Sequence, residues 1–198
     1  MRRFLSLTFA CLLAVLTTFA RGQQVDLMGT GSTLFSSKPT NASLAYPPPA
    51  EKGGLYTGGA IQFIRKNHFG LNVETAFRYD KALYNGYQRY RPVLYDINGL
   101  YTREIGAKSE GDLMAGIGGE RVIFYNEFAT CSPAFVNCPT LISSNHFLTH
   151  LGGGLRYYVW RNFFLRPELH YYYVVNNHEF HTNNLFRAGV SIGYSFGR

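Results

Sequence analysis

Long apolar runs are missing from most of this chain. After residue 22 there is no stretch of the roughly 18 uninterrupted apolar residues that a membrane-spanning helix needs. Mean hydropathy is only −0.11, and apolar residues with a helical period are hard to find. These absences exclude a spanning helix from this part of the chain, so that any insertion into a bilayer must use strands.

A strong excess of charge of one sign is also missing. Residues 1–22 combine a basic start, an apolar run and small residues before Gln23, which predicts a cleaved signal peptide. A retained anchoring helix and a lipoprotein site at Cys11 are less favoured alternatives. Three arginines lie in this segment, so the formal charge falls from +7 to +4 in the expected mature domain, residues 23–198. So small an excess indicates no nucleic-acid partner.

Cysteine is scarce, with three residues in the whole chain. Only Cys131 and Cys138 lie beyond the predicted signal peptide. Export brings them into an oxidising compartment, where a close pair usually forms a disulfide. A metal site is the competing hypothesis, but no nearby His or second Cys pair would complete four ligands. We therefore expect a Cys131–Cys138 disulfide in a polar loop.

The chain is rich in alternation with a period of two, which is typical of strands with unlike faces. In residues 69–79 the odd positions are mostly apolar or aromatic, and the even positions include Asn72, Glu74 and Arg78. Residues 113–125 alternate too, although both faces carry similar apolar surface. The full pattern predicts eight strands: residues 25–35, 55–65, 69–79, 93–101, 113–125, 151–160, 165–174 and 185–196.

The connections between these strands alternate in length. Long connections span residues 36–53, 80–89, 126–144 and 176–184, and short ones lie near residues 66–68, 106–111 and 160–162. An up-and-down meander with long loops at one end and tight turns at the other is typical of outer-membrane barrels. We therefore predict an all-β, eight-stranded antiparallel transmembrane β-barrel. A soluble β-sandwich is less favoured, because it does not require this alternation.

Residues 165–174, LRPELHYYYV, show how such a barrel would be oriented. Leu165 and Leu169 would face lipid, while the polar residues between them would point into an interior filled by side chains. Unpaired charges there would be costly, so ion pairs and hydrogen bonds are expected. The predicted polar network of the interior comprises Glu74, Arg78, Arg156, Arg166, Glu168, His170 and Arg187.

Two further details concern the last two strands. Pro167 cannot donate to a strand ladder, which predicts a bulge or a missing bond. In the final strand, the small inward residues should leave room for long charged side chains from neighbouring strands. These small residues are Gly189, Ser191, Gly193 and Ser195.

The segment FRAGVSIGYSFGR at residues 186–198 resembles the closing strand of small outer-membrane barrels of the OmpA/OmpX type. Val190, Ile192, Tyr194 and Phe196 match the outward apolar residues and terminal aromatic that the insertion machinery recognises in that family, although Gly197 and Arg198 follow here. The resemblance implies a barrel fold and an outer-membrane location, with no specific activity. Fifteen Tyr and sixteen Phe fit the aromatic girdles of such barrels.

Several polar residues are considered as candidates for catalysis, metal binding or phosphate binding. His178, His181 and Thr182 suggest a lipid A-modifying enzyme, but their spacing does not bring a nucleophile to its base. His146, His150 and His170 are expected inside the barrel as hydrogen-bonded residues and not as metal ligands. Arg121, considered together with Lys108, is a candidate for contact with lipopolysaccharide phosphates if its side chain points outward.

The function predicted from the sequence is a non-enzymatic barrel with a plugged polar interior, acting in the envelope or through its long loops. No cofactor is expected. The expected partners are outer-membrane lipid, lipopolysaccharide, the barrel-assembly machinery and a surface partner of the loops, with the barrel itself a monomer. A narrow channel, a secreted lipocalin-like carrier and, last, a lipid A-modifying enzyme are the alternatives.

Overall fold

The computed structural model describes residues 23–37, 51, 53–65, 68–125 and 141–197. The predicted signal peptide and the Cys131–Cys138 pair lie outside these residues. Within the described part, no helix is long and apolar enough to cross a membrane. The strands are β1 (Gln23–Ser36), β2 (Tyr56–Arg65), β3 (Phe69–Arg78), β4 (Ala82–Tyr84), β5 (Gln88–Gly106), β6 (Ser109–Tyr125), β7 (Leu141–Trp160), β8 (Phe163–Val174) and β9 (Asn184–Phe196).

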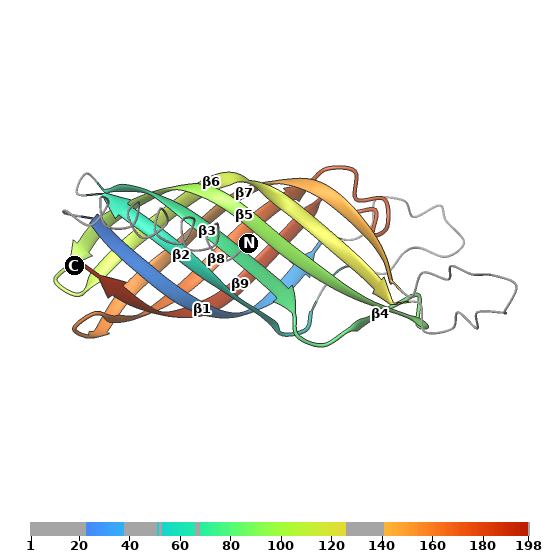
Figure 1. The fold of residues 1–198 in the computed structure, drawn as a ribbon, viewed down its shortest axis with the longest axis horizontal. Coiled ribbons are helices and arrows are strands. Elements are labelled where there is room, and N and C mark those ends of the chain that lie inside the picture. The colour runs from blue at the N-terminus through green and yellow to red at the C-terminus, as the bar shows by residue number, and fades with distance from the viewer. Residues whose placement is uncertain (1–22, 38–50, 52, 66–67, 126–140, 198) are drawn as a thin grey trace, which may run out of the picture.

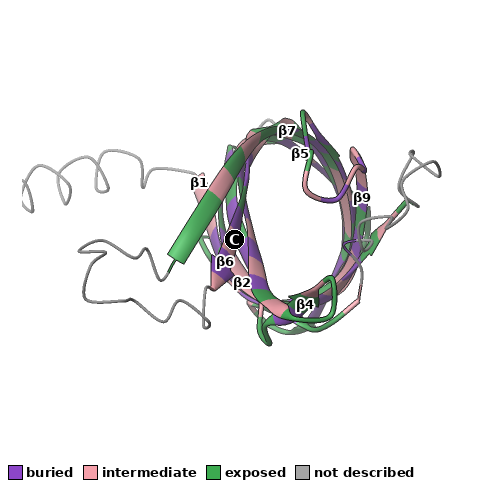
Figure 2. Ribbon diagram, turned by 90° about the vertical axis from the view of Figure 1, so that its right-hand side faces the viewer, coloured by how far each residue is buried: buried purple, intermediate pink, exposed green. Residues whose placement is uncertain are grey.

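Eight of these strands form a closed antiparallel barrel. Each pairs with its neighbour along the chain, apart from the short β4; β9 returns to pair with β1, and β3 pairs with β5. Figures 1 and 2 show the tilted strands from the side and the closed ring along its axis. The predicted eight-stranded barrel is therefore confirmed. The additional strand β4 pairs with β5 and lies within the long connection predicted at residues 80–89.

Three neighbouring strands are longer than predicted. β5, β6 and β7 have 19, 17 and 20 residues, whereas β2 and β3 have 10 each. About 9–11 residues suffice to cross a bilayer. The extra length lies largely at the end with the long loops, on the right in Figure 1. The predicted ends were too short because hydrophobic alternation fades where strand pairing still continues.

The two faces of the wall are oriented as residues 165–174 predict. On β8, Leu165 and Leu169 are exposed, whereas Arg166, Glu168 and His170 are buried. β6, whose sequence pattern is ambiguous, behaves in the same way: Leu113 and Ile117 are exposed, whereas Asp112 and Glu120 are buried. An apolar outside and a polar inside exclude the lipocalin-like carrier, which needs the opposite arrangement.

Pro167 interrupts the ladder between β7 and β8. Residue pairs are formed by Gly154 with Glu168 and by Tyr157 with Leu165, and none is formed between them. The register is the same on both sides of this gap, so no residue is inserted. Of the two predicted outcomes, the structure shows missing pairing and no bulge at Pro167, which follows from the absent N–H of proline.

Candidate functional site

The barrel interior contains a buried network centred on two hubs, Arg156 and Glu168. Arg156 projects from β7 and is fully buried. Its Nη1 forms an ion pair with Asp26 Oδ2 at 2.8 Å and donates to Glu110 Oε2 at 3.1 Å, and its Nη2 donates to Asp112 Oδ2 at 2.9 Å and to Gln62 Oε1 at 2.8 Å. These partners come from β1, β6 and β2. One guanidinium therefore joins four strands across the lumen.

Glu168 on β8 is the second hub. Its Oε2 accepts hydrogen bonds from Arg166 Nη2 at 2.6 Å and Ser191 Oγ at 2.8 Å, and its Oε1 accepts one from Thr30 Oγ1 at 2.8 Å. Arg166 Nη1 lies 3.4 Å from Asp112 Oδ2. Since Asp112 also binds the first hub, the two hubs form one continuous network.

Arg187 on β9 extends this network towards β3. Its guanidinium forms an ion pair with Glu74 and lies 3.7 Å from Glu168 Oε1. It also lies 5.7 Å from the centre of the Tyr172 ring. The structure thus brings together six of the seven residues predicted for the network. The seventh, Arg78, lies apart from them at the barrel mouth.

Two histidines form a chain beside Glu168. His150 Nδ1 lies 2.6 Å from Asn98 Oδ1, and His150 Nε2 lies 2.9 Å from His170 Nδ1. His170 Nε2 lies 3.4 Å from Glu168 Oε1. The imidazole rings are stacked, with centroids 5.0 Å apart. The chain therefore links β5, β7 and β8 at mid-barrel.

Glycines on β7 make room for these side chains. A Cβ on Gly152 would lie 2.8 Å from both His150 Nε2 and His170 Nδ1, and a Cβ on Gly154 would lie 2.9 Å from Arg166 Cγ. Contacts that short do not occur in folded proteins without movement. The absence of a side chain at these two positions is therefore a condition of the network.

The sequence predicts that small residues of β9 leave room for long charged side chains. For Gly193 that prediction is wrong. A Cβ on Gly193 would meet the Phe164 ring and the Met28 side chain. Phe164 in turn lies beneath Arg156, with 4.8 Å between the guanidinium carbon and the ring centre. Gly193 thus accommodates an aromatic ring that supports a charge, and not the charge itself.

Acidic groups outnumber arginines in the interior. Among the described residues, the fully buried arginines are Arg156, Arg166 and Arg187. Buried acids are Asp26, Glu51, Glu74, Asp96, Glu110, Asp112, Glu120 and Glu168. Ligand atoms of Glu74, Glu168 and His170 lie within 4.8 Å of one another, a spacing that would suit a metal. Arg187 contacts both carboxylates, so its guanidinium already supplies positive charge there, and we assign no metal to this cluster.

A layer of apolar side chains lies across the lumen on the long-loop side of the network. Its members come from six strands, β1, β2, β5, β7, β8 and β9, and are almost completely buried. We call these residues the transverse layer: Leu34, Tyr56, Leu94, Leu148, Tyr172, Val174 and Leu185. Because the layer receives side chains from strands all around the barrel, it separates the polar network from the mouth.

The connection between β8 and β9 caps the mouth. Phe180 is fully buried, and its ring lies 5.7 Å from that of Tyr84 and 5.1 Å from that of Tyr90. Asn177 Nδ2 donates to Glu120 Oε2 at 3.3 Å. His146 points inward, as expected, and lies at this level, with Nε2 2.9 Å from Glu179 Oε2 and 3.3 Å from Ser144 Oγ.

A second buried feature of the mouth is Glu51, from the first long connection. Its side chain is fully buried, with the Glu120 carboxylate as its neighbour. Burial, followed by the neighbouring Glu120 carboxylate, holds the pKa of Glu51 well above its ordinary value, and Arg78 opposes this only in part. Sequence reasoning missed Glu51, because a single acid in a long loop carries no periodic signal.

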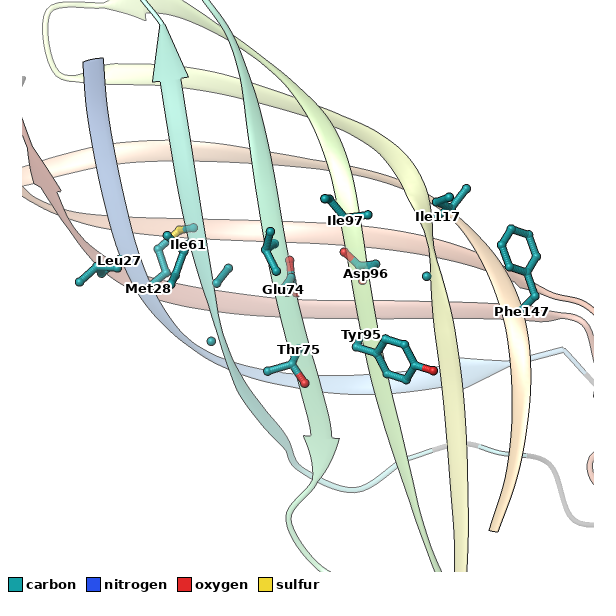
Figure 3. A pocket seen from close by; sticks show the side chains of 14 residues that line it. Leu27, Met28, Ile61, Glu74, Thr75, Tyr95, Asp96, Ile97, Ile117 and Phe147 are labelled. Carbon is teal, nitrogen blue, oxygen red and sulfur yellow. The ribbon is translucent and has the colours of Figure 1, made fainter. Parts of the chain in front are cut away.

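The outer wall is apolar and shallowly grooved. A groove of about 830 Å³ lies beside exposed residues of neighbouring strands, including Leu27, Ile61 and Ile97, whose side chains are labelled in Figure 3. The acidic side chains of Glu74 and Asp96 in the same view are buried on the other side of the wall. The groove therefore lies on the outer surface, where acyl chains can fill it.

The remaining predicted residues are dispersed. Val190, Ile192 and Phe196 are exposed on the outer face of β9, with Tyr194 half-buried, and β9 closes the barrel against β1.

Thr182 Oγ1 lies 2.7 Å from Ser37 Oγ, while His178 is exposed to solvent. Arg121 is exposed near the long-loop end of β6, whereas Lys108 lies in the turn at the opposite end. The structure therefore separates the two cations that the sequence considered together.

No family model and no curated protein matches this sequence. Among solved structures, the N-terminal β-barrel domain of Pseudomonas aeruginosa OprF has a TM-score of 0.57 at 16% identity, covering 87% of this chain and 97% of that domain. Neisserial surface protein A has a TM-score of 0.55 at 15% identity, covering 90% and 98%. A major outer membrane protein of Thermus thermophilus has a TM-score of 0.61 at 13% identity, covering 89% and 100%.

At these identities the similarity is one of fold. It agrees with the likeness to OmpA/OmpX-type barrels that the last strand suggested. With its apolar outer wall and ionic interior, the chain has the fold of an outer-membrane β-barrel.

Proposed function

We propose that this chain is a non-enzymatic barrel of the outer membrane that does not conduct, and that serves the envelope through its wall and its long loops. The transverse layer is the observation that carries this proposal. Leu34, Leu148 and Tyr172 are fully buried within it and come from three separate strands. The buried Phe180 adds a second obstacle nearer the mouth.

Conductance in planar bilayers tests the proposal. We expect no steady conductance steps from the wild-type barrel. A double variant, Leu94→Ser with Leu148→Ser, removes apolar bulk from the transverse layer, and we expect it to produce steps or flicker. The matched control is Leu113→Ser with Leu151→Ser, which changes exposed residues of the outer wall. Steady steps from the wild type would refute the proposal.

A narrow channel is the second candidate, because the interior has more acids than arginines and would favour cations. In the same recordings, a wild-type barrel that conducts steadily with cation selectivity would establish it. Loss of that conductance on Arg166→Ala would show that the network itself lines the path.

The partners of the barrel are also proposals. The outward residues of β9 are suited to recognition by the assembly machinery, because Phe196 ends an alternating apolar strand. The loops are the surface available to an extracellular partner. The barrel has its own closed ring of strands and needs no second copy to complete it, so we propose a monomer.

A further inference from the structure

The outer surface of the barrel differs in charge from its interior. While the buried acids face the lumen, several cations lie outside near the long-loop end. Lys81, Arg89 and Arg121 are exposed, and Arg91 is half-buried. Among the described residues near these cations, Asp80 is the one exposed acid. The outer surface here is therefore predominantly basic.

The register of β5 and β6 brings these cations together. Arg89 pairs with Tyr125, Arg91 with Ile123, and Val93 with Arg121. All of these residues lie on the outer face, since alternate residues of each strand point inward. Lys81 Nζ lies 3.8 Å from the centre of the Tyr125 ring. We call Lys81, Arg89, Arg91 and Arg121, together with Ile123 and Tyr125, the outer basic patch.

Two arginines of the patch are held in place by neighbouring strands and loops. Arg91 Nη2 donates to the Tyr79 carbonyl oxygen at 2.9 Å, and Arg121 Nη2 donates to Ser143 Oγ at 3.2 Å. Each of these bonds uses one of the five N–H donors of its guanidinium. Both side chains are thus oriented while retaining the capacity to bind an anion.

The height of the patch is set by β5. Its outward residues between Arg103 and Arg91 are uncharged: Tyr101, Gly99, Ile97, Tyr95 and Val93. With a strand rise near 3.3 Å and a tilt near 40°, these twelve steps cover about 30 Å along the barrel axis. This is the thickness of the hydrocarbon core of a bilayer. Arg103 and Arg91 therefore lie at opposite membrane interfaces, with the patch in the outer one.

We propose that the outer basic patch binds the phosphate groups of a phosphorylated glycolipid of the lipid A type in the outer leaflet. Arginine forms paired hydrogen bonds with phosphate oxygens, and Ile123 and Tyr125 offer apolar contact to the rest of the lipid. This inference rests on the membrane location in the proposed function. It assigns to Arg91 and Arg121 the contact that the sequence suggested for Arg121, and it leaves out Lys108.

The test uses the full barrel refolded in phosphatidylcholine vesicles that contain bisphosphorylated lipid A. The variant is Arg91→Gln with Arg121→Gln. The control, Arg103→Gln with Arg161→Gln, removes the same charge from exposed residues at the opposite end. After extraction into mild detergent, the lipid A that remains with the folded barrel is quantified. Folding is checked first for every protein, by its faster migration unheated than boiled on a detergent gel.

We expect the patch variant to retain about thirtyfold less lipid A, since each of its two lost basic residues contributes on the order of 1 kcal/mol of attraction to anionic lipid. The control should stay within twofold of wild type. Equal losses in both variants, or equal retention of dephosphorylated lipid A, would overturn the inference. So would displacement by millimolar inorganic phosphate, or equally tight binding of soluble heparin without lipid.

These outcomes are separate from those of the proposed function. A barrel that folds and does not conduct, yet retains no lipid A, refutes only the glycolipid site. A barrel that fails to insert into vesicles refutes both.

Discussion

At the scale of single residues, the most consequential side chain is Arg156. Its guanidinium is fully buried, so its charge is stable only because acidic and polar side chains of the network surround it. The same dependence makes small neighbours such as Gly152 important, because they define the space in which the network forms.

Replacing Arg156 by alanine should remove the buried cation beside Asp26 and Glu110 and leave Asp112 with Arg166 as its nearby cation. We expect Arg156→Ala to lower the free energy of unfolding by about 3–5 kcal/mol. Urea unfolding in lipid vesicles, followed by gel mobility, measures this. Arg103→Ala, which removes an exposed arginine, should stay within about 0.5 kcal/mol. An equally small effect of Arg156→Ala would show that the acids find other partners.

Adding one methyl group at Gly152 should disturb the histidine chain. Its Cβ would lie 2.8 Å from two imidazole nitrogens, so we expect Gly152→Ala to cost about 1–3 kcal/mol in unfolding free energy. Gly99→Ala is the matched control, because its Cβ would meet only the Ala115 carbonyl oxygen at 3.7 Å. If both variants unfold at the same denaturant concentration, His150 and His170 can move apart at little cost.

At the scale of elements, the strands close the ring of the barrel, and the connections between them close its mouth. The β8–β9 connection inserts Phe180 into an aromatic cluster with Tyr84, Tyr90 and Phe124. The first connection contributes the buried Glu51. Both are attached to the mouth by side chains and a few backbone bonds, such as Gly53 N to Leu34 O and Val175 N to Phe147 O, and not by a continuous strand ladder. They should therefore open before the barrel unfolds.

Truncating Phe180 should release the β8–β9 connection. We expect Phe180→Ala to increase the rate of proteolytic cleavage within residues 175–183 by tenfold or more, because about 2 kcal/mol or more of aromatic packing is lost. Heat resistance of the barrel on gels should change far less. The neighbouring exposed residue provides the control, His178→Ala. Unchanged cleavage in the Phe180 variant would mean that hydrogen bonds alone hold the connection.

The buried Glu51 should make the mouth sensitive to pH. Because its pKa is raised in the folded state, its stabilising contribution is present below the ordinary carboxyl pKa and is lost as pH rises through the raised value. We expect hydrogen exchange of the Glu120 region to speed up as pH rises, after correction for intrinsic rates. Glu51→Gln keeps a neutral side chain and should abolish this dependence. Persistence of the dependence in the variant would assign it to another group.

At the scale of the whole molecule, the barrel could be predicted from the sequence because its signals are local. Alternation over residues 69–79 or 185–196 needs only neighbouring positions, and the lengths of connections are counted directly. Inward orientation of Arg156 and Glu168 follows from the same alternation. Short-range sequence patterns are therefore enough to predict this fold.

The partners inside the barrel could not be predicted, since they depend on how far the strands are staggered around the ring. Arg156 meets Asp26, which is 130 positions away along the chain, only because the closed barrel brings β7 opposite β1. Glu51 and Phe180 enter the mouth from segments without periodicity. The outward Arg91 and Arg121 become neighbours only through the register of β5 and β6.

The unequal strand lengths have a mechanical consequence. β7, at 20 residues and a tilt near 40°, reaches about 50 Å along the axis, roughly twice the apolar band of such a barrel. β5, β6 and β7 therefore extend beyond the membrane on one side of the barrel. The rim formed by the shorter β2 and β3 ends closer to the membrane. In the part of the chain that the structure describes, the rim of the barrel is therefore oblique to the membrane plane.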